Sequence, residues 1–512
     1  MKEVLMRKRG LFKKQSDQEK KESIFPISIK VLEEKIRKEL PGEQDLFIQE
    51  HEQSGKKLLL FGVPYLIEKV DLNDYLLEPL LEKKINWTNE EILNEIPLST
   101  GVKVTSFEEI IDKLLVGGVF IYVEHEEEII CYILLNKEKR GLDKAETESL
   151  VLGPKIAFTE SISTNMNIIR FRIRSKDLVM EELKVGHSIP TDLRLVYMKS
   201  IANEDDVNTM RQRIEDLDVD KIEDAIVLKQ YLEDSELNVF PQFEITELPD
   251  RFTYAITHGK IGVLIENSPS AIIAPATFFS FLESTEDRYM RWQSGTFFRF
   301  LRFISMFFAI TVTPAYVAVV TYQYGLIPMQ LLISIGQSRA QVPFPPLLEA
   351  FLLEFMIELL REAGARLPTK VGQTMGIVGG IVIGQAAVEA GLTSNILIIV
   401  VAMSALASFT SPSYLLGSSV RIIRFPLMLL AGALGVFGIM FGLCFIIIHA
   451  IRLTSLGRPY LSPLYPLQIK DFNNVFFRSP PRYDSNRMKS FLLKDQRRFS
   501  KEEAAKKQDI DE

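Results

Sequence analysis

Residues 303–322 read FISMFFAITVTPAYVAVVTY and contain no charged side chain. A helix rises about 1.5 Å per residue, so a helix of this length crosses the roughly 30 Å of hydrocarbon in a bilayer. The stretch therefore predicts a membrane-spanning helix. It also divides the chain, because charged residues are frequent before it and rare for a long distance after it.

The charge distribution excludes a wholly soluble protein. Among the 512 residues, Lys and Arg number 40 against 54 Asp and Glu in residues 1–300, but 7 against 5 in residues 301–450. Residues 451–512 carry 13 against 8. So sparse a middle third cannot form the surface of a water-soluble domain. Cys131 and Cys444 are the only cysteines, which excludes a disulfide framework and a cysteine-built metal site.

The basic N-terminal segment is expected to be a disordered tail or a polybasic contact with anionic lipid. No apolar run of signal-peptide length follows it, so the first 300 residues are expected to stay in the cytoplasm. Within them, residues 118–136 and 260–277 each place two apolar runs around a polar turn, which predicts two hairpins. Apolar residues at helical spacing predict helices over 164–173 and 204–218.

The segments around the first span are harder to interpret. Residues 278–302 mix aromatic and basic side chains, which suits either a headgroup boundary or an amphipathic core helix. Residues 326–337 are apolar but too short to span, so they are expected to be re-entrant or a half-helix. Residues 347–366 carry Glu and Arg among apolar residues, so this helix is amphipathic and cannot face lipid all round.

Two further stretches predict spans, and basic residues bear on their orientation. Residues 371–420 are expected to form a helical hairpin with a turn at 391–395, and residues 425–451 one continuous span. Basic residues at both ends of the region favour a cytoplasmic start and a cytoplasmic C-terminus. Four spans satisfy both ends but leave five basic residues outside: Arg361, Arg366, Lys370, Arg421 and Arg424. A fifth span over 347–366 would place those basic residues in agreement with this rule, but it would place the C-terminal tail outside. We expect both ends in the cytoplasm.

The predicted fold class is an α/β cytoplasmic N-terminal region, in two subdomains, followed by an α-helical polytopic membrane domain. The expected ranges are 1–35 for the basic tail, 36–160 and 161–295 for the two α/β subdomains, 296–455 for a membrane domain of four to six helical segments, and 456–512 for a basic C-terminal tail.

Motifs for catalysis are missing from the sequence. The five histidines lie far apart, and the chain lacks a phosphate-binding GxxxxGK[ST], an HExxH and a GxSxG. We therefore expect no enzymatic activity, no cofactor and no metal. Contact with nucleic acid is not expected either.

Small residues recur at four-residue spacing in the apolar region, which predicts close helix packing within one chain or between chains. The candidates are Gly376, Gly380, Gly384, Gly435, Gly438 and Gly442. Polar residues and prolines there indicate either ordinary interfacial and packing roles or a cation path and its gate. The pore or gate candidates are Gln373, Gln385, Glu389, Pro314, Pro343, Pro345 and Pro346.

Four segments together resemble the A subunits of GerA-type spore germinant receptors. They are ESISTNMNIIRFRIRSKDL (160–178), LPDRFTYAITHGKIGVLIENSPSAIIAPATFFSFLESTEDRY (248–289), VPFPPLLEAFLLEFMIELLREAGARLP (342–368) and GQTMGIVGGIVIGQAAVEAGLTS (372–394). The resemblance implies a cytoplasmic two-part α/β domain, four to six spans and residence in the spore inner membrane. It also implies a transporter-like B subunit that binds the nutrient and a lipoprotein C subunit on the outer face.

The same resemblance implies a ring-forming subunit, similar to a pentameric ligand-gated cation channel whose opening releases monovalent ions and starts germination. A non-conducting scaffold that couples the transporter-like subunit to cytoplasmic effectors is the second class of function. A solute carrier is a weaker third, because no repeated half is visible in the sequence.

Overall fold

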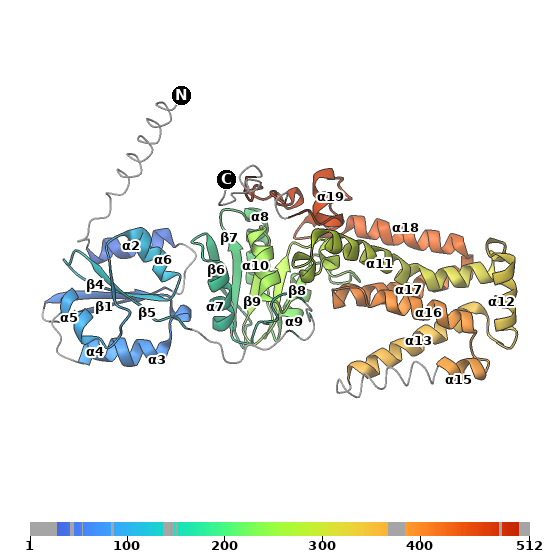
Figure 1. Cartoon of the computed structure of the whole chain (residues 1–512), viewed down its shortest axis with the longest axis horizontal. Coiled ribbons are helices and arrows are strands. Elements are labelled where there is room, and N and C mark those ends of the chain that lie inside the picture. The colour runs from blue at the N-terminus through green and yellow to red at the C-terminus, as the bar shows by residue number, and fades with distance from the viewer. Residues whose placement is uncertain are drawn as a thin grey trace, which may run out of the picture. The chain divides into compact units, whose positions relative to one another are not determined.

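The structure is a computed structural model of the chain. It describes residues 28–40, 46–53, 55–82, 87–136, 145, 148, 152–366, 384–480 and 484–500. The elements are labelled in Figure 1, and the chain divides into two compact units. The first consists of residues 1–145, 156–228 and 245–272, and the second of residues 146–155, 229–244 and 273–512.

The first sheet of the α/β part has the strand order β1-β2-β4-β5-β3, and each pair of neighbouring strands is antiparallel. Its elements are α2 (Ile29–Glu39), β1 (Phe47–Gln53), β2 (Lys56–Gly62), η1 (Pro64–Leu66), α3 (Lys69–Asp71), η2 (Leu72–Leu77), α4 (Glu78–Glu82), α5 (Asn89–Glu95), β3 (Val102–Val104), α6 (Phe107–Leu114), β4 (Gly118–Val123) and β5 (Ile129–Ile133). Strands β4 and β5 confirm the hairpin predicted over 118–136.

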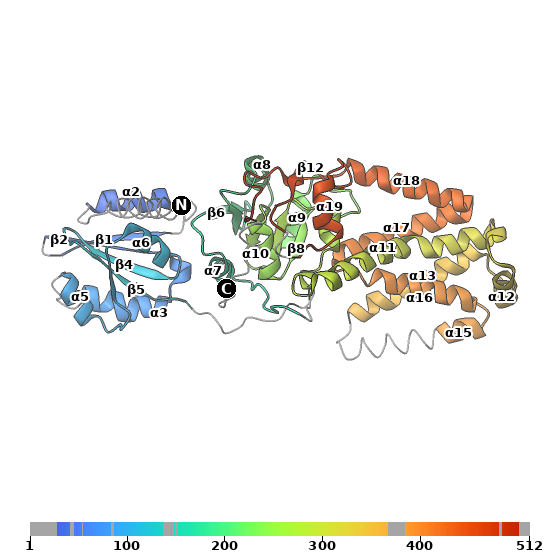
Figure 2. The same cartoon turned by 45° about the horizontal axis from the view of Figure 1, so that its top comes forward.

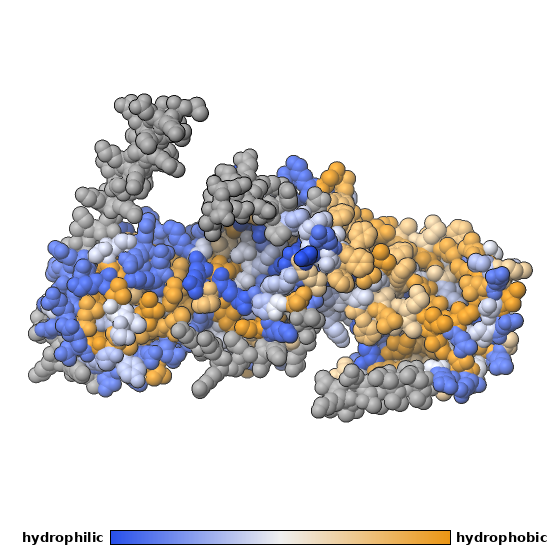
Figure 3. Space-filling model, viewed as in Figure 1, coloured by the Kyte–Doolittle hydropathy of each residue, from blue (hydrophilic) through white to orange (hydrophobic). Residues whose placement is uncertain are grey.

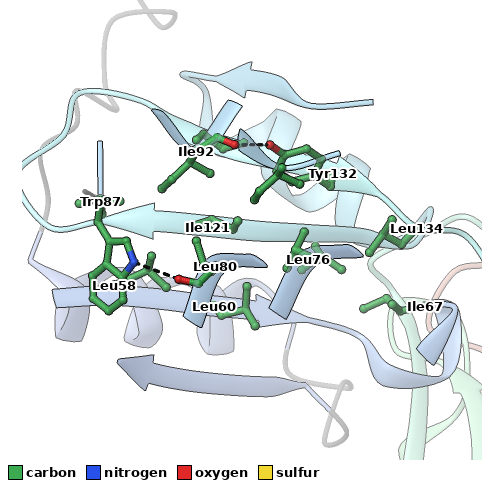
Figure 4. Packing of buried hydrophobic residues seen from close by; sticks show 14 residues of the cluster. Leu58, Leu60, Ile67, Leu76, Leu80, Trp87, Ile92, Ile121, Tyr132 and Leu134 are labelled. Atoms are coloured by element: carbon green, nitrogen blue, oxygen red, sulfur yellow. Dashed lines mark hydrogen bonds between the residues drawn. The ribbon is translucent and has the colours of Figure 1, made fainter. Parts of the chain in front are cut away.

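This sheet is covered by helices on both faces (Figure 1), which explains why its central strands are continuous apolar runs rather than alternating ones. Leu58 and Ile121 belong to the core on one face, where Trp87 donates to the Leu80 carbonyl at 3.4 Å (Figure 4). The intervening residues point the other way. Burial there raises the pKa of the Cys131 thiol to about 12, so this cysteine is an inert core side chain.

The second sheet has the order β6-β7-β9-β10-β8. Its elements are α7 (Ile162–Arg172), β6 (Leu178–Val185), β7 (Thr191–Met198), α8 (Glu204–Glu215), α9 (Ala225–Leu232), β8 (Glu244–Thr246), α10 (Pro249–Thr257), β9 (Ile261–Ile265) and β10 (Ala271–Ala274). Strands β9 and β10 are neighbours and confirm the second predicted hairpin, and α7 and α8 confirm the two predicted helices within a few residues at their ends.

The two sheets repeat one topology. Numbered from its own first strand, each has the order 1-2-4-5-3, and a helix precedes the first and the fourth strand in both. The backbone repeats as well. Gly117 and His125 have φ values of 80° and 75° before and after β4, and Gly259 and Asn267 have 89° and 65° around β9. The α/β part therefore contains the same strand order twice, within residues 47–133 and within residues 178–274.

The helical region and the C-terminal segments belong to the second unit. Their elements are η3 (Phe278–Leu282), η4 (Thr285–Arg288), α11 (Trp292–Thr321), η5 (Tyr324–Leu326), α12 (Met329–Arg339), α13 (Pro346–Ala365), α15 (Gly384–Glu389), α16 (Asn395–Ser408), α17 (Tyr414–Leu434), α18 (Val436–Arg452), β11 (Thr454–Ser455), β12 (Arg458–Pro459), α19 (Ile469–Phe476) and η7 (Lys489–Phe491). Helices α11, α13, α16, α17 and α18 pack side by side (Figures 1 and 2).

Contacts between these helices set their directions. Helices α11 and α17 run the same way, because Phe303 and Leu416 share a cluster near their starts and Tyr322 donates to the Gly432 carbonyl near their ends. Helix α16 runs the opposite way, since Ser394 at its start is 3.3 Å from the Tyr316 hydroxyl. Helices α13 and α18 also run opposite to α17. The starts of α11 and α17 thus lie at the same end of the bundle as the ends of α13, α16 and α18.

Among the described residues, α11 and α17 are long and apolar enough to cross a bilayer, and α16 and α18 are apolar but shorter. The predicted single span over 425–451 is wrong. Helix α17 ends at Leu434, Gly435 takes φ 64°, and α18 returns antiparallel to α17. A positive φ is open to glycine and ends the helix there.

The predicted hairpin over 371–420 needs a second correction. Helix α16 ends at Ser408, and residues 414–420 belong to α17, whose start is capped by the Ser413 side chain. Pro412 just before that cap cannot continue the helix. Residues 371–383 of this prediction lie outside the described part of the chain.

Candidate functional site in the helical region

Helix α13 carries three carboxylates on its inner side, and each one joins a different part of the bundle. Glu349 and Glu354 are buried, and Glu358 is partly buried. A carboxylate inside an apolar bundle is costly unless a cation or hydrogen-bond donors accompany it. Each of the three has such partners.

Glu354 forms the central pair. Its Oε2 atom accepts from Arg424 Nη1 of α17, and its Oε1 atom accepts from the Thr313 hydroxyl of α11 at 2.8 Å. The Glu354 and Arg424 side chains are 1% and 2% exposed, so the pair is shielded from water. The Nε and Nη2 atoms of Arg424 have no hydrogen-bond partner among the described residues. This pair links three helices through one buried contact.

Glu349 lies at the end of the bundle where α13 and α16 start, which is called the far end below. Its Oε1 atom accepts from the Ser394 backbone N–H at 2.6 Å and from the Thr393 hydroxyl at 3.2 Å, at the start of α16. Arg339, the last residue of α12, lies 3.5 Å from its Oε2 atom. The carboxylate thus occupies a helix N-terminus, where a negative charge is favoured.

Glu358 lies one turn beyond Glu354 and meets two arginines. Arg361 Nη1 is 3.1 Å from its Oε1 atom, and Arg421 Nε of α17 is 3.6 Å from its Oε2 atom. Arg361 also donates to the Ser408 hydroxyl at 3.3 Å, at the end of α16. The result is a line of ion pairs along α13 that ties it to α12, α16 and α17.

The predicted pore residues lie apart from this line. Gln385 and Glu389 are exposed on α15, where Gln385 Nε2 donates to Glu389 Oε1 at 2.9 Å. Within residues 303–366 and 384–451, Glu389 is the carboxylate that has no cationic partner. Gln373 falls outside the described residues.

The predicted prolines occupy two kinds of position. Pro314 is buried inside α11, next to the Thr313 that bonds Glu354. Pro345 is the N-cap of α13 and Pro346 its first residue, where no N–H is needed, and Pro343 lies in the preceding turn. The prolines at 345 and 346 therefore start α13 rather than interrupt it.

The predicted glycines also separate. A Cβ atom on Gly438 would lie 2.0 Å from the Leu430 carbonyl oxygen, and one on Gly442 would lie 2.4 Å from Leu427. Both glycines thus face α17 of the same chain, and Gly435 makes the turn between the two helices. A Cβ atom on Gly384 would meet no atom of the described residues within 4 Å. Gly376 and Gly380 lie outside the described residues.

A second feature, missed by sequence reasoning, is the segment 234–242. It binds the open end of the α17–α18 hairpin, where α17 starts and α18 ends, and this end is called the near end of the bundle. Ser419 of α17 donates to the Val239 carbonyl, and His449 of α18 lies 2.8 Å from the Asn238 side-chain oxygen. Asp234 accepts from the Thr454 hydroxyl and, at 3.0 Å, from the Leu456 and Gly457 backbone N–H groups. The segment therefore holds both helices and the β11–β12 turn that follows them.

Tyr460 completes this junction from the apolar side. It is fully buried among Phe240, Phe278 and Phe281. Burial raises the pKa of its hydroxyl well above the usual range, so it stays neutral. No short motif marks the junction in the sequence, because its two sides lie about two hundred residues apart along the chain.

Asp234→Ala is expected to destabilise this junction by about 1.5–3 kcal/mol, because three donors lose a charged acceptor. Thermal unfolding of the full-length protein in detergent checks this. Glu236→Ala is the matched control, since Glu236 is exposed two residues away. Equal midpoints for the two variants would show that Asp234 does not hold the turn.

Comparisons with known proteins give a consistent result. Residues 34–490 match the family described as Bacillus/Clostridium GerA spore germination protein. The chain is 39% identical to spore germination protein GerQA of Bacillus cereus, over 94% of this chain and 96% of that protein. It is 34% identical to spore germination protein KA of Bacillus subtilis, over 96% and 91% respectively.

One solved structure is also similar, the crystal structure of the N-terminal domain of the A subunit of the Bacillus megaterium spore germinant receptor GerK3. The match covers 50% of this chain and 98% of that chain, with 22% identity and a TM-score of 0.39.

Proposed function

This chain belongs to the Bacillus/Clostridium GerA spore germination protein family, and we propose that it acts in germination as the membrane subunit of a nutrient-sensing germinant receptor. We further propose that copies of the chain assemble into a ligand-gated cation channel. Nutrient binding to a transporter-like B subunit shifts a closed-to-open equilibrium, and cations leave the spore core. A lipoprotein C subunit completes the complex on the outer face, and a pentamer is the proposed ring.

The observation that carries the channel proposal is that Glu389 has no cationic partner among the described residues. Along residues 303–366 and 384–451, the other carboxylates have arginine partners, as Glu349, Glu354 and Glu358 do with helices of their own chain. Glu389 instead is exposed, and within these described ranges its hydrogen-bond partner is Gln385. Repeated around an axis, this carboxylate forms a ring of negative charge, which attracts cations.

The placement of arginines supports a cytoplasmic location for the near end of the bundle, where α11 starts and α18 ends. Among the described residues, that end carries Arg299, Arg302, Arg361, Arg366, Arg421 and Arg452. The far end carries Arg339, which is paired with Glu349. Positive charge collects on the cytoplasmic side of membrane proteins. We therefore propose a spore inner-membrane location with the α/β region and the C-terminus inside.

Glu389→Gln is expected to lower cation selectivity several-fold, because the ring loses its charge while Gln385 keeps a hydrogen-bonding partner. The measurement is the potassium-to-chloride permeability ratio of the purified oligomer in planar bilayers. Glu362→Gln is the matched control, since Glu362 is an exposed carboxylate of the same region that pairs with Arg366 on the surface. An unchanged ratio in Glu389→Gln would exclude Glu389 from the cation path.

A non-conducting scaffold is the alternative function. The segment 234–242 supports the scaffold function, because this segment mechanically joins the chain before the bundle to helices α17 and α18. The same recording separates the two proposals: a verified ring that carries no current under any germinant condition supports the scaffold.

A further inference from the structure

The chain presents a run of apolar side chains to the outside just after the last helix of the bundle. Residues 459–469 contain no charge. Leu464, Tyr465, Leu467 and Ile469 within it are 41%, 55%, 66% and 74% exposed. Soluble surfaces rarely collect so many large apolar groups in so few residues, so the run indicates a contact with something outside the chain.

The run is held in shape by its own backbone and by buried neighbours. The Leu464 N–H donates to the Leu461 carbonyl at 3.0 Å, and the Gln468 N–H donates to the Pro463 carbonyl at 2.9 Å. On the inner side, Tyr460 anchors the start of the run in the aromatic cluster of the junction. A compact turn with its apolar side chains outward is therefore built into the fold.

Helix α19 follows the run directly. Contacts at the end of α19 determine which residues of α11 it lies beside. Phe476 packs against Phe303 at a ring-centroid distance of 5.0 Å, and Phe477 lies 6.5 Å from Phe300. Arg299 donates to the Val475 carbonyl at 2.9 Å. The C-terminal end of α19 therefore lies beside Phe303, the first residue of the uncharged stretch 303–322, where the proposed spanning helix enters the bilayer.

Neighbouring side chains are those typical of a headgroup boundary. An apolar groove on α11 is lined by Trp292, Phe297 and Phe300, together with Ile304. Arg458 and Lys470 flank the uncharged run on its two sides. Aromatic side chains and long basic side chains favour the depth at which phosphates meet acyl chains. In Figure 3 the hydrophobic surface of the helical region continues up to the position of α19.

We propose that residues 464–469 insert into the headgroup–acyl boundary of the same bilayer and anchor the C-terminal segment to lipid. The inference rests on the membrane location proposed above, and adds a second, non-spanning contact to it. Lipid is the occupant favoured by the level of α19 and by the continuity of the apolar surface. A short stretch of chain connects this anchor to the junction formed by residues 234–242 and 454–457. The anchor therefore keeps the junction at a fixed depth relative to the bilayer.

The test measures the depth of a probe in the full-length protein. A Cys444→Ser background removes the exposed native cysteine, and Cys131 is buried and unreactive. Leu467→Cys, with Ile469→Cys as a second position, is labelled with an environment-sensitive fluorophore and reconstituted into lipid vesicles. Gln496→Cys serves as the exposed control in the C-terminal segment, and Phe307→Cys as the control within α11.

The expected result is strong quenching at positions 467 and 469 by lipids that carry the quencher near the headgroup, and weak quenching at 496. Water-like emission at 467 and 469 would overturn the proposal. A blue-shifted emission that lipid quenchers do not reach would also overturn it, and would assign the run to a neighbouring protein surface. Position 307 distinguishes the anchor proposal from the membrane location on which it rests. Quenching at 307 without quenching at 467 rejects the anchor alone. No quenching at either position rejects the membrane location itself.

Discussion

Arg424→Met is expected to lower the free energy of unfolding of the helical region by about 3–5 kcal/mol, because it leaves the Glu354 carboxylate buried without a cation. The Glu354 and Arg424 side chains are 1% and 2% exposed, so water cannot replace the lost partner. The Thr313 hydroxyl supplies one neutral donor, which does not offset a missing positive charge. Titration of the detergent-solubilised protein with a denaturing surfactant, followed by tryptophan fluorescence, measures the change.

Two controls identify the cause. The double variant Glu354→Leu with Arg424→Met removes both charges and is expected to recover most of the loss, since a well-packed apolar pair often equals a buried ion pair. Arg366→Met breaks an exposed pair with Glu362, which is worth at most about 1 kcal/mol. A double variant as unstable as the single one would assign the loss to packing rather than to the unpaired carboxylate.

Gly438→Leu is expected to open the α17–α18 hairpin, at a cost of about 3 kcal/mol or more. A Cβ atom at this position would meet the Leu430 carbonyl oxygen at 2.0 Å, and a backbone atom cannot rotate aside as a side chain can. The two helices must therefore separate. Gly438→Ala tests the Cβ atom alone, and limited proteolysis near Gly435 reports the opening of the turn.

Gly336→Ala on α12 is the matched control for this clash. Nothing lies within 4 Å of the position its Cβ atom would take. Alanine there is expected to stabilise the helix by about 0.5–1 kcal/mol, the opposite sign, because glycine is the more flexible residue in a helix. Similar loss of stability in Gly438→Ala and Gly336→Ala would show that helix packing at Gly438 is not close.

The elements with strong local signals could be predicted from the sequence. The uncharged stretch 303–322 lies within α11 except for its last residue, which is the C-cap of that helix, and the two predicted hairpins are present in the two sheets. The turn at Gly435 could not be predicted from the sequence in the same way. It lies inside 27 uncharged residues, and only its backbone angle distinguishes it from the glycines at 438 and 442 that remain helical. A usable signal existed at Pro412–Ser413, a proline followed by a helix cap.

The charged line along α13 illustrates the limit for the candidate site. The charged residues were evident in the sequence, but Glu354 and Arg424 are 70 residues apart, and their pairing depends on the directions of two helices. Those directions show only in the contacts between the helices, such as Glu349 with the start of α16 and Tyr322 with Gly432 near the end of α17. Because α13 ends where α17 starts, Arg361 and Arg421 lie at the same end of the bundle as Arg452, the last residue of α18. On the orientation proposed above, these arginines and the C-terminus then share one side of the bilayer.

The repeated strand order of the α/β part has an evolutionary consequence. Each sheet is formed by five strands from one continuous stretch of chain, and every strand has its neighbours within its own sheet. Neither sheet therefore depends on the other for a strand pairing. Duplication of one five-stranded unit would account for both sheets, and afterwards each copy could change its sequence without disturbing the strand order of the other.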